Sequence, residues 1–275
     1  KVNVGAKARF GYQDTNVAGG SAGDITTLDV VNADLAVNGK VNSITDFGMG
    51  LHYDGSTFAV DTASMSFRKA GGSDLNVRVG RVYTQFGNYT DVFTPIQTLA
   101  QTLTMAKQDV VELGMSSGNV SGSAWFFKNE QDDDDTTDVN KFGAKVAFTG
   151  KNADYNYGAS VGYVNDVRTN SSVAKTGDPW GKTGLSSNRK SAAYDLHGNV
   201  ASGPFSLDVD FLKFSRSVEA AADITYRPQV MGVTAGYSMD TAGYKSNIAL
   251  GYEKAKEAKS SGLLDYKSRM SFAYG

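Results

Sequence analysis

The 275-residue chain contains no cysteine, four prolines and only two histidines, His52 and His197. Without cysteine there are no disulfide bonds, thiolate metal sites or cysteine nucleophiles. Two isolated histidines do not make a ligand cluster, and the chain carries no phosphate-binding loop or dinucleotide fingerprint. We therefore expect no metal and no cofactor.

Net charge is also low, at −2, and no run of 18 apolar residues occurs. The first observation argues against nucleic acid as a partner, and the second excludes a transmembrane helix. A mean hydropathy of −0.32 does not exclude a membrane barrel, because barrel strands are only half apolar and their loops are polar. Lys1 opens directly into an alternating segment, so we expect a processed chain.

What the chain has in abundance is strict alternation of apolar and polar residues. In "KFGAKVAFTGKNADYNYGASVGYVND", residues 141–166, Phe142, Val146 and Val161 belong to one face, and Lys145 and Ser160 belong to the other. A period of two over two runs joined by a polar turn predicts a β-hairpin with one apolar and one polar face.

The same pattern predicts fourteen strands. They are expected near residues 1–12, 25–39, 44–53, 57–68, 74–83, 108–116, 120–128, 140–149, 154–165, 191–201, 204–214, 223–238, 244–255 and 264–275. Short and mostly longer connections alternate between them, with 54–56 as a short exception. Many strands of nine residues or more, with short turns at one end and long loops at the other, are typical of an outer-membrane barrel. A soluble barrel or double sandwich is the alternative, although soluble strands are usually shorter.

The polar face of these strands would line the lumen. Closure of the barrel would place the first strand beside the last, so that four basic residues form one wall: Lys7, Arg9, Lys267 and Arg269. Asp195, Asp208 and Asp210 are expected to form a lumenal acidic patch. The basic residues either hold anions or pair with acids such as Asp34 and Asp46.

The segment 94–109 is the one stretch with helical spacing. Pro95 would begin a helix, and Ile96, Leu99 and Leu103 recur near a period of 3.6. It either folds into the lumen as a constriction segment or packs over the rim.

Two places depart from the alternation. The phase of Leu75, Val77 and Val79 puts Arg81 toward lipid, and the phase shifts between Tyr226 and Val233, around Pro228. We expect a β-bulge at each place.

The two histidines and the acidic run could each serve a function or be ordinary polar surface. The histidines are expected on the lumenal side as wall residues, because neither lies in a pattern with a serine nucleophile on the same face. The acidic run Asp132–Asp135 is expected in a solvated external loop; Ca²⁺ binding and attraction of cations to the pore mouth are the alternatives.

The segment "VGRVYTQFGNYTDVFTPIQTLAQTL", residues 79–103, resembles the LbtU-like siderophore porins, a family of bacterial outer-membrane β-barrels. "GSAWFF", "NKFGAKVAF" and "YNYGASVGYVND" follow in a similar order. Gln85 stands where that family leads us to expect proline, and the chain ends without the usual terminal aromatic residue. The resemblance implies an outer-membrane barrel and iron–siderophore uptake, and it supplies no catalytic residues.

The sequence therefore predicts an all-β protein: a single transmembrane antiparallel barrel, residues 1–275, with short periplasmic turns and long extracellular loops. The expected function is a non-enzymatic porin-type channel in the bacterial outer membrane for small polar solutes, including a ferric siderophore. Expected partners are outer-membrane lipid and lipopolysaccharide, and no oligomeric state is indicated. A plugged structural or adhesive barrel and an outer-membrane hydrolase are the alternatives.

Overall fold

The computed structural model describes residues 2–15, 25–53, 56–69, 74–87, 100, 104, 107–127, 139, 141–167, 191–215, 218–221, 224–241, 243–256 and 268–274. Its strands are β1 (Val2–Thr15), β2 (Ile25–Lys40), β3 (Thr45–Tyr53), β4 (Phe58–Phe67), β5 (Asn76–Tyr83), β6 (Lys107–Ser117), β7 (Val120–Phe127), β8 (Lys141–Lys151), β9 (Asn156–Val164), β10 (Ala193–Ser202), β11 (Phe205–Phe214), β12 (Val218–Ala221), β13 (Ile224–Tyr226), β14 (Gln229–Thr241), β15 (Tyr244–Lys256) and β16 (Ser268–Tyr274).

Fourteen of these strands form one antiparallel sheet in chain order, with β14 following β11. This number confirms the one that the alternation predicts. The remaining strands, β12 and β13, pair only with each other. Among the described residues, no helix is long and apolar enough to cross a membrane.

The chain forms two compact units, Lys1–Val82 and Tyr83–Gly275, each described here by itself. The first contains β1 to β4 and nearly all of β5. Its pairings are regular apart from two shifts in register, one between Arg9 and Phe10 in β1 and one between Gly50 and Leu51 in β3.

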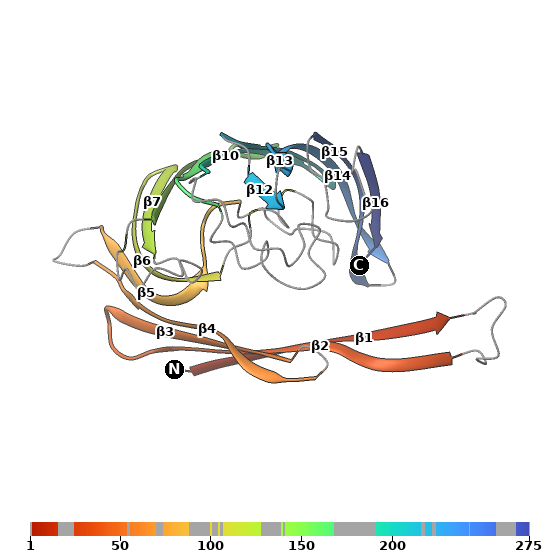
Figure 1. The fold of residues 1–275 in the computed structure, drawn as a ribbon, viewed down its shortest axis with the longest axis horizontal. Coiled ribbons are helices and arrows are strands. Elements are labelled where there is room, and N and C mark those ends of the chain that lie inside the picture. The colour runs from red at the N-terminus through yellow and green to blue at the C-terminus, as the bar shows by residue number, and fades with distance from the viewer. Residues whose placement is uncertain are drawn as a thin grey trace. The chain divides into compact units, whose positions relative to one another are not determined.

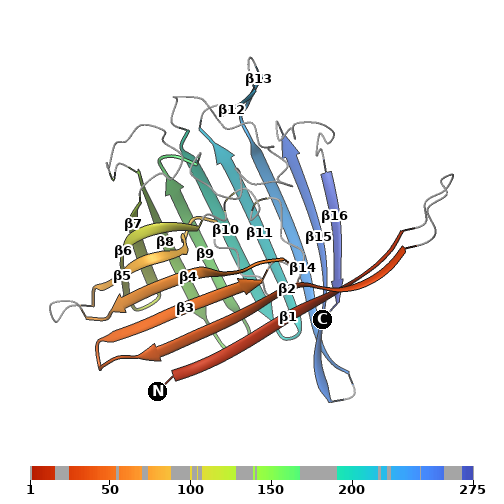
Figure 2. The ribbon, with the colours of Figure 1, turned by 60° about the horizontal axis from the view of Figure 1, so that its bottom comes forward.

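The second unit contains the strands from β6 onward, which run side by side as a curved sheet (Figures 1 and 2). The β12–β13 hairpin projects beyond the ends of its neighbours (Figure 2). Short turns join the strands at the opposite end. Gly118 and Gly203 occupy two of these turns with φ of +57° and +54°, a conformation that glycine adopts without steric cost.

Both expected bulges are absent from the described pairings. β4 and β5 pair without a shift from Phe67↔Val77 to Ala63↔Arg81, so Arg81 keeps the phase of Val77 and Val79. The expected strand 223–238 is in fact two strands, β13 and β14, which belong to different sheets and are separated by Arg227 and Pro228. Proline has no N–H to donate to a ladder, but its carbonyl accepts a hydrogen bond from the Phe214 amide at 2.9 Å.

The helical segment is shorter than the spacing suggests. Residues 107–109 belong to β6 and are not helical. Ala100 and Thr104 have helical conformation, are each 1% exposed, and are joined by a 2.7 Å hydrogen bond from the Thr104 hydroxyl to the Ala100 carbonyl.

Candidate functional site: the polar inner faces of the sheet

In the second unit, the described side chains of β6 to β11, β14 and β15 divide into an exposed, mostly apolar face and a polar or covered face. We call them the outer and the inner face. On the outer face Val161 is 47% exposed, Leu196 49% and Leu250 58%. In water this exposed apolar surface would be costly, whereas in lipid it is favourable. The outer face is therefore suited to a bilayer, and any solute would meet the inner face.

Asp195, Asp208 and Asp210 all lie on the inner face, on β10 and β11. Asp195 is 1% exposed and Asp210 6%. A carboxylate with so little contact with water needs compensating charge or hydrogen-bond donors nearby. Lys145 on β8 acts electrostatically on Asp195 and Asp210, and His197 on β10 lies beside Asp210.

Asp195 faces Lys145 across an intervening strand. The register runs from Lys145 on β8 through Gly162 on β9 to Asp195 on β10. A Cβ atom at Gly162 would overlap the Asp195 carboxylate, so the missing side chain leaves the space through which the carboxylate reaches toward Lys145. Lys145 interacts electrostatically with both Asp195 and Asp210.

The loop after β5 also reaches this inner face. The backbone amide of Gly87 is close enough to act on the Asp195 carboxylate. Gly87 has a φ of +62° and lies against the side chain of the buried Thr104. The described part of the 84–107 connection therefore packs on the inner face of the second unit.

His197 lies on β10, directly opposite Asp210 on β11. Its Nδ1 atom is 2.6 Å from Asp210 Oδ1, and its Nε2 atom is 3.9 Å from Asp208 Oδ1. The side chains of His197 and Asp210 are 11% and 8% exposed. The imidazole thus lies between two carboxylates and has one acid within hydrogen-bond distance.

Glu253 extends this acidic region to β15. Gly232 on β14 lies between Asp210 and Glu253 in the register. A Cβ at Gly232 would lie 3.5 Å from Glu253 Cγ and 3.9 Å from Asp210 Cβ. The side chains of Asp210 and Glu253 therefore flank the same glycine, and Glu253 is only 4% exposed. Glu253 is not among the acidic residues that the sequence pattern predicts for the lumen.

The same row contains a serine, which bears on the hydrolase alternative. Ser160 on β9 lies directly opposite His197. However, both ring nitrogens of His197 face carboxylates of β11, whereas β9 is on the other side of β10. A serine–histidine–aspartate relay needs the second nitrogen directed at the hydroxyl. The arrangement of His197 and the carboxylates therefore fits a charged wall better than a serine–histidine–aspartate catalytic site.

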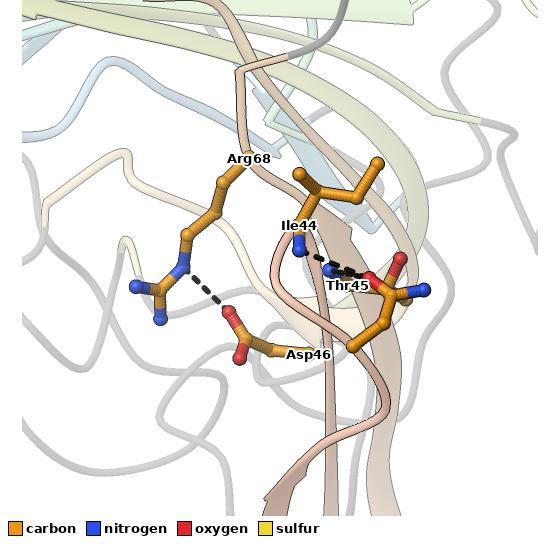
Figure 3. Close-up of polar contacts among 5 residues, drawn as sticks. Ile44, Thr45, Asp46 and Arg68 are labelled. Carbon is orange, nitrogen blue, oxygen red and sulfur yellow. Dashed lines mark hydrogen bonds and ion pairs between the residues drawn. The ribbon is translucent and has the colours of Figure 1, made fainter.

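In the first unit, the strand face that carries Asp46 and Arg78 contains a hollow of about 860 Å³, lined mostly by polar residues, among them Lys40, Asp46, Arg68 and Arg78. Arg68 reaches across to Asp46, with Nε 2.5 Å from Oδ2 (Figure 3). The Arg68 amide also donates to the Ile44 carbonyl at 2.7 Å. Arg68 is 56% exposed at its side chain and therefore keeps donors available to a solute.

The β2–β3 turn beside this ion pair is held by Asn42. Its Oδ1 atom accepts hydrogen bonds from the amides of Ile44 and Thr45, at 2.9 and 2.8 Å. Asparagine commonly organises turns in this way. The turn fixes the start of β3 and, with it, the position of Asp46.

His52 repeats the pairing found for His197. It lies opposite Asp34, and its Nδ1 atom is 2.6 Å from Asp34 Oδ1. On its other side β4 presents Ala59, which has no nucleophile. Alternation of apolar and polar residues indicates neither of the two histidine–aspartate pairs. Hairpin symmetry would have located one of them, because His197 and Asp210 are equally distant along the chain from the turn residues Gly203 and Pro204.

The predicted basic wall is described only in part. The strands place Lys7 opposite Asp34 and Arg269 opposite Glu253, and Arg9 opposite Asn32. Lys267 lies outside the described residues. The basic wall stays a prediction. Lys7 and Arg269 each lie opposite a carboxylate, which is the arrangement that the alternative, pairing with lumenal acids, requires.

Several other expectations fall on parts of the chain that the structure does not describe. These are the constriction residues Pro95, Ile96, Leu99 and Leu103, and the acidic run Asp132–Asp135. Within the described ranges, no group of three or more histidines or carboxylates is placed to hold a metal ion.

Three solved structures that resemble this chain are bacterial outer-membrane proteins. OmpF of Salmonella typhi, in complex with daunomycin, matches with a TM-score of 0.58 at 13% identity, over 93% of this chain and 79% of that one. OprB of Pseudomonas putida matches with a TM-score of 0.54 at 13% identity, over 92% and 72%. The outer membrane channel DcaP of Acinetobacter baumannii matches with a TM-score of 0.51 at 9% identity, over 94% and 80%.

No protein-family model matches the chain, and no curated protein sequence does. The structural likeness is therefore one of fold. The chain has the fold of the bacterial outer-membrane β-barrels, with fourteen antiparallel strands in its sheet. This is the fold class that alternation and loop lengths predict.

Proposed function

We propose that the chain is an outer-membrane channel through which small polar solutes diffuse passively. The observation that carries the proposal is the contrast between the two faces. The outer face is apolar and exposed, whereas the inner face holds Lys145, Asp195, His197 and Asp210. Polar groups along a lumen lower the cost of moving a hydrated solute across the membrane.

Single-channel recording in planar lipid bilayers tests this proposal. The purified protein, folded in detergent, should give discrete conductance steps, and the heat-denatured protein in the same detergent should give none. A folded protein without conductance would contradict the proposal and favour a plugged structural barrel.

We further propose that the solutes are anions, including the carboxylates of a ferric siderophore. Support comes from the four basic residues Lys7, Arg9, Lys267 and Arg269, from Arg68 in the hollow of the first unit, and from the resemblance of residues 79–103 to siderophore porins. Cationic side chains along a lumen raise the local concentration of anions.

Replacement of all four basic residues by glutamine should move the reversal potential in a salt gradient toward cation preference. The matched variant, with arginine at Lys7 and Lys267, keeps the charge and should behave as the parent. An unchanged reversal potential in a glutamine variant that still conducts would show that these residues only pair with lumenal acids. A ferric carboxylate siderophore should reduce the parent's current more than the iron-free buffer does.

A further inference from the structure

Three exposed lysines gather on the outer face of the second unit, at the end where the long connections lie. Lys213 is near the end of β11, and Lys254 and Lys256 are at the end of β15. Gln229, the first residue of β14, lies between Lys213 and Lys256 in the register. Met231, one step along the same face of β14, is opposite Lys254.

The spacing of these strands brings the lysines within reach of one another. Adjacent strands are about 4.8 Å apart, and residues two positions apart on one strand are roughly 7 Å apart. Lys213 and Lys256 are separated by one intervening strand, so their backbones are about 10 Å apart. Lysine side chains are flexible enough for three ammonium groups to converge on one anion from these positions.

The level of these lysines along the strands can be read from the aromatic residues beside them. Lys213 lies opposite Tyr194, which lies opposite Tyr163. The rings of Tyr163 and Tyr194 have centroids 5.1 Å apart. Rows of tyrosine on a membrane protein mark the level of the lipid headgroups. The basic cluster is thus at headgroup level, and below it lie the apolar side chains of Met231 and Leu250, 50% and 58% exposed.

On the described strands, no outward-facing carboxylate lies beside the cluster. The outward positions of β10, β11, β14 and β15 that the structure describes include no aspartate or glutamate. Glu253 is next to Lys254 in sequence, but it is buried on the inner face. Three like charges this close repel one another unless an anion lies between them. The cluster is therefore complementary to an anion that arrives from the lipid.

We propose that Lys213, Lys254 and Lys256 bind the phosphorylated headgroup of a lipid in the outer leaflet of the outer membrane. Long loops of bacterial barrels are extracellular, which places this end of the strands in that leaflet. The lipopolysaccharide headgroup carries phosphates at this level, and its acyl chains would lie along Met231 and Leu250. Gln229 adds an amide donor between the lysines. This site does not depend on the barrel being an open channel.

The test is native mass spectrometry of the folded protein in detergent with diphosphoryl lipid A as the probe. The parent should retain lipid A, and the K213Q/K254Q/K256Q variant should bind it at least about tenfold more weakly. The corresponding triple arginine variant keeps the charge and should bind like the parent. K151Q removes an exposed lysine at the short-turn end of β8 and should leave affinity unchanged.

The same measurement with lipid A stripped of its phosphates separates phosphate recognition from apolar contact. The parent should bind the phosphate-free probe as weakly as the glutamine variant binds intact lipid A. Equal binding of lipid A by the parent and the glutamine variant would overturn the proposal. Equal displacement of lipid A by phosphatidylglycerol would also overturn it, because the site would then not distinguish the outer-leaflet lipid.

Discussion

Glycine positions on the inner face are occupied by side chains from the next strand. Trp125 on β7 is completely buried, and its ring lies over Gly143 on β8, where a Cβ atom would overlap the ring. Asp195 uses the space over Gly162 in the same way. These glycines are therefore required by packing and not by backbone conformation.

Gly143→Ala should lower the free energy of unfolding by about 1–3 kcal/mol, because the added methyl group forces the indole ring to move. Urea titration of folding into lipid vesicles measures this, with Trp125 fluorescence as the local probe. The matched control is Gly114→Ala on the inner face of β6, where the nearest atom would be 3.8 Å away; it should change stability by less than about 0.5 kcal/mol. Equal losses in the two variants would refute the packing role of Gly143.

Val161→Arg should destabilise the fold by about 2–4 kcal/mol if it lies near the bilayer midplane, because it places a charge on the lipid-facing surface. Val161 is on the outer face at 47% exposure. Ser160→Arg is at the same depth on the inner face and should instead alter conductance, with a much smaller loss in the same folding titration. Similar losses for both variants would mean that the two faces are assigned wrongly.

At the residue scale, the sequence alone predicts which face of a strand a side chain lies on. It predicts less well which side chain of the neighbouring strand it contacts. A period of two suffices to place Asp195, Asp208 and Asp210 on one face of their strands. The partner of His197, in contrast, is set by the register between β10 and β11, which depends on where the turn begins. Gln229 and Lys213 come together for the same reason, although the β12–β13 hairpin separates them in sequence.

At the scale of the elements, an ion pair and two hydrogen bonds hold the strands of the β8–β9 hairpin together at the end opposite its turn. Lys141 Nζ donates to Asp166 Oδ2 at 2.8 Å, and both side chains are buried, at 2% and 0% exposed. Beside them the amide of Phe142 donates to Asn165 Oδ1 at 2.8 Å, and the amide of Asn165 donates to the Phe142 carbonyl at 3.0 Å. These contacts fix the register of the hairpin where the long connections begin.

Asp166→Asn should destabilise the protein by about 3–5 kcal/mol, because it removes a negative charge that is paired with the buried Lys141 ammonium. The double variant Lys141→Met/Asp166→Leu removes both charges and should cost less than the single change. A double-mutant cycle made of Lys141→Met, Asp166→Leu and the double variant measures the coupling in urea, monitored by gel shift of the folded barrel. Additive effects in the two positions would show that the ion pair contributes no coupling energy.

Alternation predicts where the strands lie. It does not predict where one alternating segment is divided into two strands of different sheets. The segment 223–238 alternates on both sides of Pro228, but periodicity does not reveal that β13 pairs locally with β12 while β14 joins the main sheet. Arg81 needs no bulge, because a long side chain on an outer face can direct its charge toward the interface while its methylene groups stay in the apolar region.

At the scale of the whole molecule, the fold follows from two regularities of the sequence. One is the apolar face of nearly every strand, and the other is the alternation of short and long connections. What fills the lumen could not be predicted in the same way, because helical spacing in residues 94–109 does not indicate which surface the segment covers. The buried Ala100 and Thr104 place its described part against the inner face of the second unit.

The direction of the strands across the membrane gives the last prediction. The connections that contain Asp132–Asp135 and residues 168–190 are separated by β8 and β9, an even number of crossings, so both should be extracellular. Epitope tags inserted in each should be labelled by antibody on intact cells. A tag between Gly118 and Asn119, in the short turn after β6, is one crossing away from the first of them and should be labelled only after the outer membrane is permeabilised; open space around Gly118 makes this turn a tolerant position. Heat-dependent gel mobility verifies that each tagged protein is folded.

Labelling of only one of the two long connections on intact cells would require an odd number of crossings between them. The strand order that supports both the channel and the lipid site would then be wrong.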